Sequence, residues 1–202
     1  EFYQHYTNHN LPEKAIILIP RDLTPSRNME VYKEIWPLGI SAMGVFLITL
    51  AVFPVVCVKI DSMSLDKEWA NVYFQPVATF FLFSVGDYMG RQSSGFILWP
   101  KRGSRILYLM VLLRLVFIPL FLLCNHDPKS FLPVVFYHDA YYIVFMFLFA
   151  FSNGYCSSLY MMYGPKMVTE DRAELAGAMM VAMLGLGLML GGISSFAFAL
   201  IE

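Results

Sequence analysis

Two side chains of opposite charge, Asp87 and Arg91, lie four residues apart in a strongly apolar part of the chain. On a helix this spacing places both on one face, and Ser84 and Ser94 extend the polar stripe. A charge at the centre of a membrane-spanning helix costs on the order of 2.5 to 3.5 kcal/mol, so a helix that keeps one usually uses it. A carboxylate accepts hydrogen bonds and a guanidinium donates them, so we predict a solute-binding site at Ser84, Asp87 and Arg91. The alternative is an ion pair that only makes insertion tolerable.

Asn153 lies in another apolar stretch and shares one helix face with Ser157 and Tyr160. Counting about 1.5 Å of helix rise per residue puts Asn153 near the level of Asp87. Transporters commonly bind their solutes near the middle of the membrane, so Asn153 joins the predicted solute-binding residues. Hydrogen bonding between helices is the alternative for this face.

Four further residues are predicted to serve gating or helix packing. Arg114, near the centre of a third apolar stretch, could reach Asp87 as a second partner or could anchor helices by donating to backbone carbonyls. Gly90 lacks a side chain beside the polar stripe, so a helix or a ligand can approach there. Gly187 and Gly191 form a Gly-x-x-x-Gly pair, which favours close helix contact or, alternatively, a smooth surface for sliding.

The sequence gives little support for catalysis. It has a single aspartate inside the apolar stretches, no His, Cys and Glu set at metal-ligand spacing, no Gly-x-Ser-x-Gly and no phosphate loop. His138 and Asp139 stand at the end of an apolar stretch, where contact with water explains them more simply than a proton relay. Cys57, Cys124 and Cys156 form no Cys-x-x-Cys pair and are interpreted as small apolar residues. We therefore expect no enzyme, no cofactor and no metal.

The composition is that of an integral membrane protein. Of the 202 residues, 58% are hydrophobic and 14% are charged, and the mean hydropathy is +0.59. Soluble domains carry about 25% charged residues. The formal net charge of -1 provides no basic surface for a nucleic acid. We predict an all-α fold that spans a membrane several times.

Five stretches are long enough to cross a membrane, which takes about 20 apolar residues. They are residues 37–58, 72–99, 106–124, 141–163 and 175–201. Short loops make successive helices antiparallel, so residues 37–202 should form one five-helix domain. Residues 1–36 are polar and are expected to be the remnant of a cytoplasmic loop that ends in a short amphipathic helix. Because the first residue is Glu1 and not Met, we expect a fragment of a longer protein.

Lys and Arg are distributed unevenly between the two sides that this topology defines. Nine fall on the side of the N-terminal segment: Lys14, Arg21, Arg27, Lys33, Lys101, Arg102, Arg105, Lys166 and Arg172. Three fall on the other side: Lys59, Lys67 and Lys129. The positive-inside rule then places the N-terminal segment in the cytoplasm and the C-terminus outside.

Short motifs follow one another in a characteristic order along these stretches. They are Gly86-Asp-Tyr-Met-Gly-Arg91, Trp99-Pro100, Arg114-Leu-Val-Phe-Ile-Pro119, Leu122-Leu-Cys-Asn125, His138-Asp139, Phe151-Ser-Asn-Gly-Tyr155, Gly164-Pro-Lys166 and Glu174-Leu-Ala-Gly177. Each motif is short. In this order over residues 37–201, the series closely resembles helices seven to eleven, the C-terminal half, of the equilibrative nucleoside transporters.

The resemblance implies an eleven-helix relative of the major-facilitator fold, built from six plus five helices and working by alternating access. This chain would be the five-helix half. Its partners would be a missing six-helix N-terminal half, the lipid bilayer and a purine or pyrimidine nucleoside, and its location the plasma membrane. In that family the residues matching Asp87 and Arg91 help to hold the ribose hydroxyls. Gly86 departs from the pattern, because the family has an apolar residue there.

Two other functions stay open at this point. Relatives of the family include carriers of organic cations and of free nucleobases. A cation carrier should have an unpaired acid in the membrane, whereas Asp87 has Arg91 beside it. From a different class, five helices could form a membrane interaction subunit that carries no solute.

Overall fold

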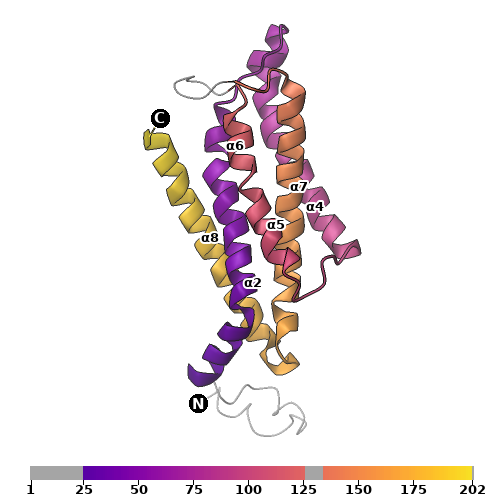
Figure 1. Cartoon of the computed structure of the whole chain (residues 1–202), viewed down its shortest axis with the longest axis vertical. Coiled ribbons are helices and arrows are strands. Elements are labelled where there is room, and N and C mark those ends of the chain that lie inside the picture. The colour runs from indigo at the N-terminus through magenta and orange to yellow at the C-terminus, as the bar shows by residue number, and fades with distance from the viewer. Residues whose placement is uncertain (1–24, 126–133, 202) are drawn as a thin grey trace, which may run out of the picture.

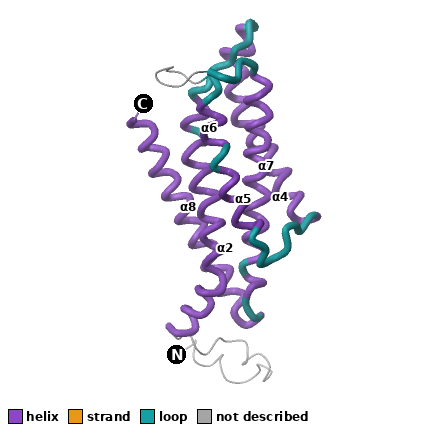
Figure 2. The backbone as a smooth tube through the Cα atoms, in the orientation of Figure 1, coloured by secondary structure: helices purple, strands orange, loops and turns teal. Residues whose placement is uncertain are grey.

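The computed structural model describes residues 25–125 and 134–201, and its elements are all helices. The prediction of an all-α fold is confirmed for this part of the chain. Figures 1 and 2 show the long helices lying side by side along one axis. Residues 1–24, which make up most of the predicted loop remnant, and Lys129 lie outside the described residues.

The elements follow in a simple order along the chain. They are α2 (Pro25–Val52), α3 (Val55–Val58), the π-helical segment η1 (Trp69–Phe81), α4 (Leu82–Phe96), α5 (Ile106–Arg114), α6 (Phe117–Leu122), α7 (Asp139–Tyr163), the short 3-10 turns η2 (Pro165–Met167) and η3 (Glu170–Arg172), and α8 (Ala173–Ile201). The helix α2 therefore starts well before the first expected span, and η1 leads directly into α4.

Prolines explain where two of the expected spans are interrupted. A proline inside a helix has no N–H to donate and clashes with the carbonyl four residues earlier. Pro54 separates α2 from α3. Pro119 lies four residues after Leu115, the position at which α5 gives way to α6. The third expected span is therefore two short helices, and Arg114 is the last residue of the first one.

Two close helix pairs organise the bundle, and glycines make both possible. The helix α8 packs along α2, and a Cβ added at Gly187 would lie 2.5 Å from the carbonyl O of Met43. At Gly191 an added Cβ would lie 2.8 Å from the Cβ of Leu50. The Gly-x-x-x-Gly pair thus serves helix contact in this structure, as small residues commonly do between membrane helices. The second pair joins α4 to α7.

Buried apolar side chains form two clusters along the bundle. One lies toward the start of α2 and the end of α7 and includes Ile35, Leu159 and Met180. The other lies toward the opposite end and includes Phe121 and Phe149. On α7 the first cluster starts after residue 154 and the second stops at Phe149. The intervening stretch carries buried polar groups and becomes the centre of the candidate site.

Successive helices run in opposite directions, so the linkers between them lie alternately at the two ends of the bundle. Figure 1 shows the start of α2 and the linker from α7 to α8 at the lower end, with the linker from α4 to α5 in the lower half, while the C-terminal end of α8 points upward. Three helical stretches are long and apolar enough to cross a membrane, namely Asn28–Val58, Asp139–Met167 and Glu170–Phe196. The stretch Ile106–Leu122 is apolar but shorter. Large apolar side chains point outward from α8, for example Ile193 and Phe196, and suit contact with lipid.

Candidate functional site

The predicted ion pair sits where α4 and α7 touch most closely. A Cβ added at Gly90 would lie 2.1 Å from the carbonyl O of Phe151, and one at Gly154 would lie 1.9 Å from the carbonyl O of Asp87. Only residues without a side chain allow the two backbones to approach in this way. The contact holds Asp87 of α4 directly against α7, so its carboxylate meets Asn153.

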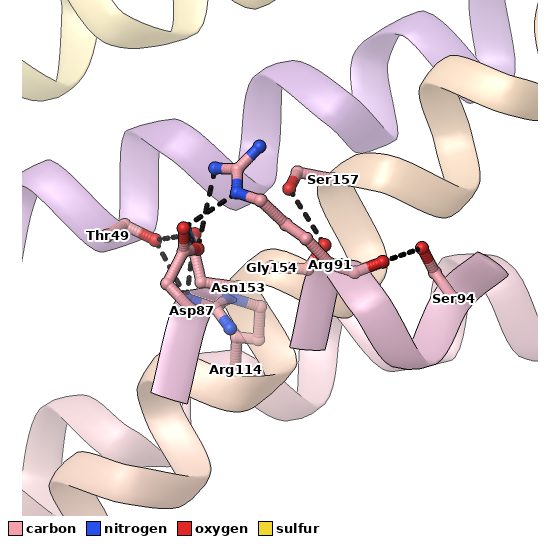
Figure 3. Close-up of polar contacts among 8 residues, drawn as sticks. All are labelled: Thr49, Asp87, Arg91, Ser94, Arg114, Asn153, Gly154 and Ser157. Carbon is pink, nitrogen blue, oxygen red and sulfur yellow. Dashed lines mark hydrogen bonds and ion pairs between the residues drawn. The ribbon is translucent and has the colours of Figure 1, made fainter. Parts of the chain in front are cut away.

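The Asp87 carboxylate is held by two neighbours (Figure 3). Arg91 donates from Nε to Oδ2 at 2.7 Å and from Nη2 to Oδ1 at 3.5 Å. Asn153 donates from Nδ2 to Oδ1 at 2.7 Å. The Asp87 side chain is 18% exposed and that of Arg91 is 45% exposed. The carboxylate is therefore fixed in position, while the guanidinium faces outward from the helix pair.

Asn153 links this ion pair to a buried network that also involves α2 and α5. Its Oδ1 accepts from Thr49 Oγ1 at 2.7 Å and from Arg114 Nη2 at 3.4 Å. Arg114 Nη2 donates to Thr49 Oγ1 at 2.7 Å, and Arg114 Nη1 donates to the carbonyl of Phe149 at 3.0 Å. Four helices thus contribute to one polar cluster, made of Thr49, Asp87, Arg114 and Asn153.

Arg114 is 1% exposed, so its charge has been removed from both water and lipid headgroups. Besides the acceptors already described, Nη1 donates to Ser152 Oγ, and the guanidinium lies 4.6 Å from the centre of the Phe149 ring. Its Nε is buried without a hydrogen-bond partner in the described part of the chain. Stabilisation comes from neutral acceptors and from the negative charge of Asp87, which reaches Arg114 through the Asn153 amide.

The structure brings together some of the predicted residues and separates others. Asp87, Arg91 and Asn153 form one cluster, and Arg114 joins it through Asn153 and not by a hydrogen bond to Asp87. Arg114 also donates to a backbone carbonyl, as the packing alternative predicted. Ser84 is exposed and donates to the carbonyl of Phe80 in its own helix, so it contacts no other member of the cluster.

The remaining predicted residues are glycines that serve helix contacts. Gly90 serves the contact between α4 and α7, and Gly187 and Gly191 serve the separate contact between α8 and α2. The face predicted for α7 is engaged in hydrogen bonds between and within helices, since Tyr160 Oη donates to the carbonyl of Leu107 at 2.7 Å and Ser157 Oγ to that of Gly154 at 3.2 Å.

Sequence reasoning missed Thr49, Ser152 and Gly154. A signal existed for Thr49, because it is a polar residue inside an otherwise apolar run of α2. It was a weak signal, since a threonine in a membrane helix can satisfy its hydroxyl on its own backbone, and Thr49 Oγ1 is indeed 2.7 Å from the carbonyl O of Val45. Gly154 stands in the motif with Asn153, but its role depends on which helix packs against it.

Asp139 has a separate structural role at the opposite end of the bundle from the start of α2. Its carboxylate accepts from Ser62 Oγ, from the backbone N of Met63 at 2.8 Å and from Trp69 Nε1 at 3.0 Å. These bonds tie the loop before η1 to the first turn of α7. A carboxylate in the first turn of a helix is also favoured by the helix dipole.

Comparison with known proteins identifies the family to which this architecture belongs. The family model described as nucleoside transporter matches residues 25–200. The chain belongs to the nucleoside transporter family. It is 40% identical to equilibrative nucleoside transporter 1 of Rattus norvegicus over 97% of this chain and 49% of that protein. It is 46% identical to equilibrative nucleoside transporter 1 and 42% identical to equilibrative nucleoside transporter 2 of Homo sapiens, in each case over 83% of this chain and 37% of the relative.

Two conclusions follow from family membership. The chain is part of a multi-pass integral membrane protein, and its relatives are transporters by name and not enzymes, which confirms the resemblance seen in the motifs. The chain spans about half the length, or less, of the relatives it matches.

Proposed function

We propose that this chain is the C-terminal half of a facilitative nucleoside transporter and that Asp87 and Arg91 bind the sugar of the nucleoside. The observation that carries the proposal is the arrangement around the Asp87 carboxylate. Asn153 orients this carboxylate, and Arg91, whose side chain is 45% exposed, forms an ion pair with it. A rigid acceptor next to an accessible donor matches the vicinal hydroxyls and ring oxygen of a ribose.

The hydrogen-bonding capacity of the pair supports this assignment. A carboxylate offers about four lone-pair positions, and three donor contacts to Asp87 are present in the described part of the chain. A ribose hydroxyl can therefore donate to Oδ2 without displacing Asn153. Within the same described part, Arg91 uses two of its five N–H donors, both on Asp87, so the others can donate to the sugar.

The rest of the transport cycle is proposed from the family and from the charge pattern. A six-helix N-terminal half would cover the face that carries Asp87 and Arg91, bind much of the nucleobase, and move against this half by alternating access. Residues 1–36 would belong to the cytoplasmic loop between the halves. The C-terminus would lie outside the plasma membrane, as nine Lys and Arg on one side and three on the other favour.

Replacement of Asp87 by Asn in the full-length protein tests the sugar-binding role. We expect Asp87→Asn to abolish most uptake of ribonucleosides and to reduce uptake of 2′,3′-dideoxy analogues proportionally less, because only the former donate two hydroxyls to the carboxylate. A charge-assisted hydrogen bond contributes about 1.5 to 3 kcal/mol, or roughly a 10- to 150-fold effect on affinity. Uptake of both substrates is measured at matched surface expression.

Ser84→Ala is the matched control, because Ser84 lies on the same helix as Asp87 and its hydroxyl bonds only to the backbone carbonyl of Phe80 within the described residues. It should leave both fluxes near the wild-type value. Equal loss of both fluxes in Asp87→Asn would make Asp87 a structural or gating partner of Arg91, and the ribose assignment would then be wrong. The family's transport function would still stand in that case.

A further inference from the structure

A polar hollow lies at the end of the bundle where α2 begins. It has a volume of about 470 Å³ and is formed by α2 and by the two linkers at that end. The lining residues are Glu34, Arg102, Gly103, Lys166, Met167, Val168 and Thr169. No member of the Asp87 cluster lines it, so the hollow is separate from the candidate sugar site.

The hollow contains two cationic side chains and one carboxylate. Arg102 comes from the linker between α4 and α5 and donates from Nη1 to the backbone carbonyl of Lys166, which holds the two linkers together. In the described part of the chain, the Lys166 ammonium and the other Arg102 N–H groups form no hydrogen bond or ion pair. By contrast, Arg172 at the same end is bound to Glu30 at 3.1 Å. Within the described residues, nothing therefore competes with an anion for the two cations of the hollow.

The depth of the hollow in the membrane can be inferred from nearby aromatic residues. Trp36 is 45% exposed two residues beyond Glu34, and Trp99 is 58% exposed three residues before Arg102. Tryptophans of membrane proteins concentrate at the level of the lipid headgroups. Arg102, Lys166 and Glu34 then lie at or just beyond that level, where a phosphate of the nearer leaflet can reach them.

The hollow also has an apolar part and a hydrogen-bond acceptor. Met167 and Val168 are half-buried in its lining and can contact the glycerol backbone or the first acyl carbons of a lipid. The Glu34 carboxylate repels an anion but accepts hydrogen bonds from hydroxyl groups. A headgroup that carries both a phosphate and several hydroxyls therefore matches the lining better than a phosphate alone.

We propose that this hollow binds the headgroup of an inositol phospholipid, with Arg102 and Lys166 on the phosphate and Glu34 accepting from the inositol hydroxyls. Basic pockets between helices at the cytoplasmic side of membrane proteins are suited to such headgroups. Because Arg102 and Lys166 belong to different linkers, the bound lipid stabilises the contact between the α4–α5 connection and the α7–α8 connection. The site is independent of the identity of the transported solute.

The test measures thermal stability of the purified full-length protein in detergent as phosphatidylinositol, phosphatidic acid or phosphatidylcholine is added. A ligand that binds the folded state raises the melting temperature in a saturable way. We expect phosphatidylinositol to act at the lowest concentration and phosphatidylcholine to have no effect. In the double variant Arg102→Gln and Lys166→Gln, the apparent affinity for phosphatidylinositol should fall about 30-fold, from about a fivefold contribution by each basic residue.

The matched control removes the same number of charges from residues that do not line the hollow, by Lys101→Gln together with Arg105→Gln. This variant should respond to phosphatidylinositol as the wild type does. Lys166→Gln alone provides a second variant if the double variant is unstable without lipid, because the Lys166 side chain makes no hydrogen bond or ion pair in the described residues. Glu34→Gln should reduce the preference for phosphatidylinositol over phosphatidic acid, which has no headgroup hydroxyls.

Three results would overturn the proposal. An equal loss in the control and in the double variant would mean that the whole basic end attracts anionic lipid without a site. If phosphatidylcholine raised the melting temperature as much as phosphatidylinositol does, the negative charge of the headgroup would play no part in binding. Saturable stabilisation by inorganic phosphate or by soluble inositol phosphate at the same concentrations, with loss of the lipid effect, would assign the hollow to a free phosphate and not to a lipid.

Discussion

Arg114 is a charged side chain that is only 1% exposed, so its burial carries a desolvation cost. Burial of a guanidinium is tolerated when most of its donors are satisfied. Here the acceptors for Nη1 and Nη2 come from α2 and α7 while the arginine itself belongs to α5, and Nε alone lacks a partner in the described part of the chain. The planar fork of an arginine can reach acceptors in different directions, whereas a lysine concentrates its donors at one point. Arg114 therefore acts as a junction between three helices as well as a counter-charge near Asp87.

This geometry predicts that Arg114→Lys destabilises the protein although the charge is kept. Loss of even one or two charge-assisted hydrogen bonds should cost about 1.5 to 3 kcal/mol each. We expect a clear fall in the melting temperature of the purified full-length protein and a lower amount at the cell surface. Arg105→Lys, in the exposed linker before α5, is the control and should behave as the wild type. An unchanged melting temperature in Arg114→Lys would show that the network contributes little to folding.

The candidate site was predictable only where its geometry is local. Asp87 and Arg91 follow from the helical repeat, because residues four apart on one helix meet whatever the rest of the fold does. The partners of Arg114 lie 35 to 65 residues away in sequence, so they depend on how three helices pack. Thr49 therefore could not be distinguished from any other hydroxyl in a membrane helix.

At the level of helices, apolar stretches can be read directly from the sequence, but the points at which a helix is interrupted cannot. Apolar runs and the lipid thickness define where a helix can span, but a proline can either kink a helix or divide it. Pro37 lies inside α2 without ending it, whereas Pro54 and Pro119 coincide with helix breaks. For Pro119 the break follows directly after the buried Arg114.

The contact between α4 and α7 predicts a contrast between two glycines of the same helix. A Cβ at Gly90 would lie 2.1 Å from a backbone carbonyl of α7, whereas a Cβ at Gly95 would have no neighbour within 4 Å. Gly90→Ala should push the helices apart, lower stability by about 1 to 3 kcal/mol or more, and displace Asp87 from Asn153. Gly95→Ala should be neutral or slightly stabilising, because alanine favours a helix.

Both glycine variants are compared in the full-length protein by melting temperature and by ribonucleoside uptake at matched surface expression. A displaced carboxylate should reduce uptake in Gly90→Ala beyond what the loss of protein explains. Wild-type uptake and stability in Gly90→Ala would mean that α4 and α7 do not approach as closely in the membrane as they do in this structure.

At the scale of the whole molecule, the two ends of the bundle differ in charge. The linkers from α4 to α5 and from α7 to α8 lie at the end where α2 starts and contain Lys101 and Lys166, while Lys67 lies in the loop before η1 at the other end (Figure 1). Single cysteines at these positions, in a background without reactive cysteines, should be labelled from outside intact cells only at position 67. Labelling of position 101 or 166 from outside would reverse the proposed orientation.

The final prediction concerns the independence of the five-helix unit. Asp87 and Arg91 remain 18% and 45% exposed on a bundle that otherwise buries Asn153 and Arg114, so the polar face of α4 is unsuited to lipid unless a protein surface covers it. Residues 1–202 expressed alone should therefore enter the membrane but transport no nucleoside. Co-expression with a six-helix N-terminal half from a close relative should restore uptake, and Asp87→Asn in this half should remove the restored activity. Uptake by residues 1–202 alone, from a species shown by cross-linking to be monomeric, would contradict the two-half architecture. Alternating access requires this half to move against a second protein surface, and in that experiment the solute would cross the membrane without one.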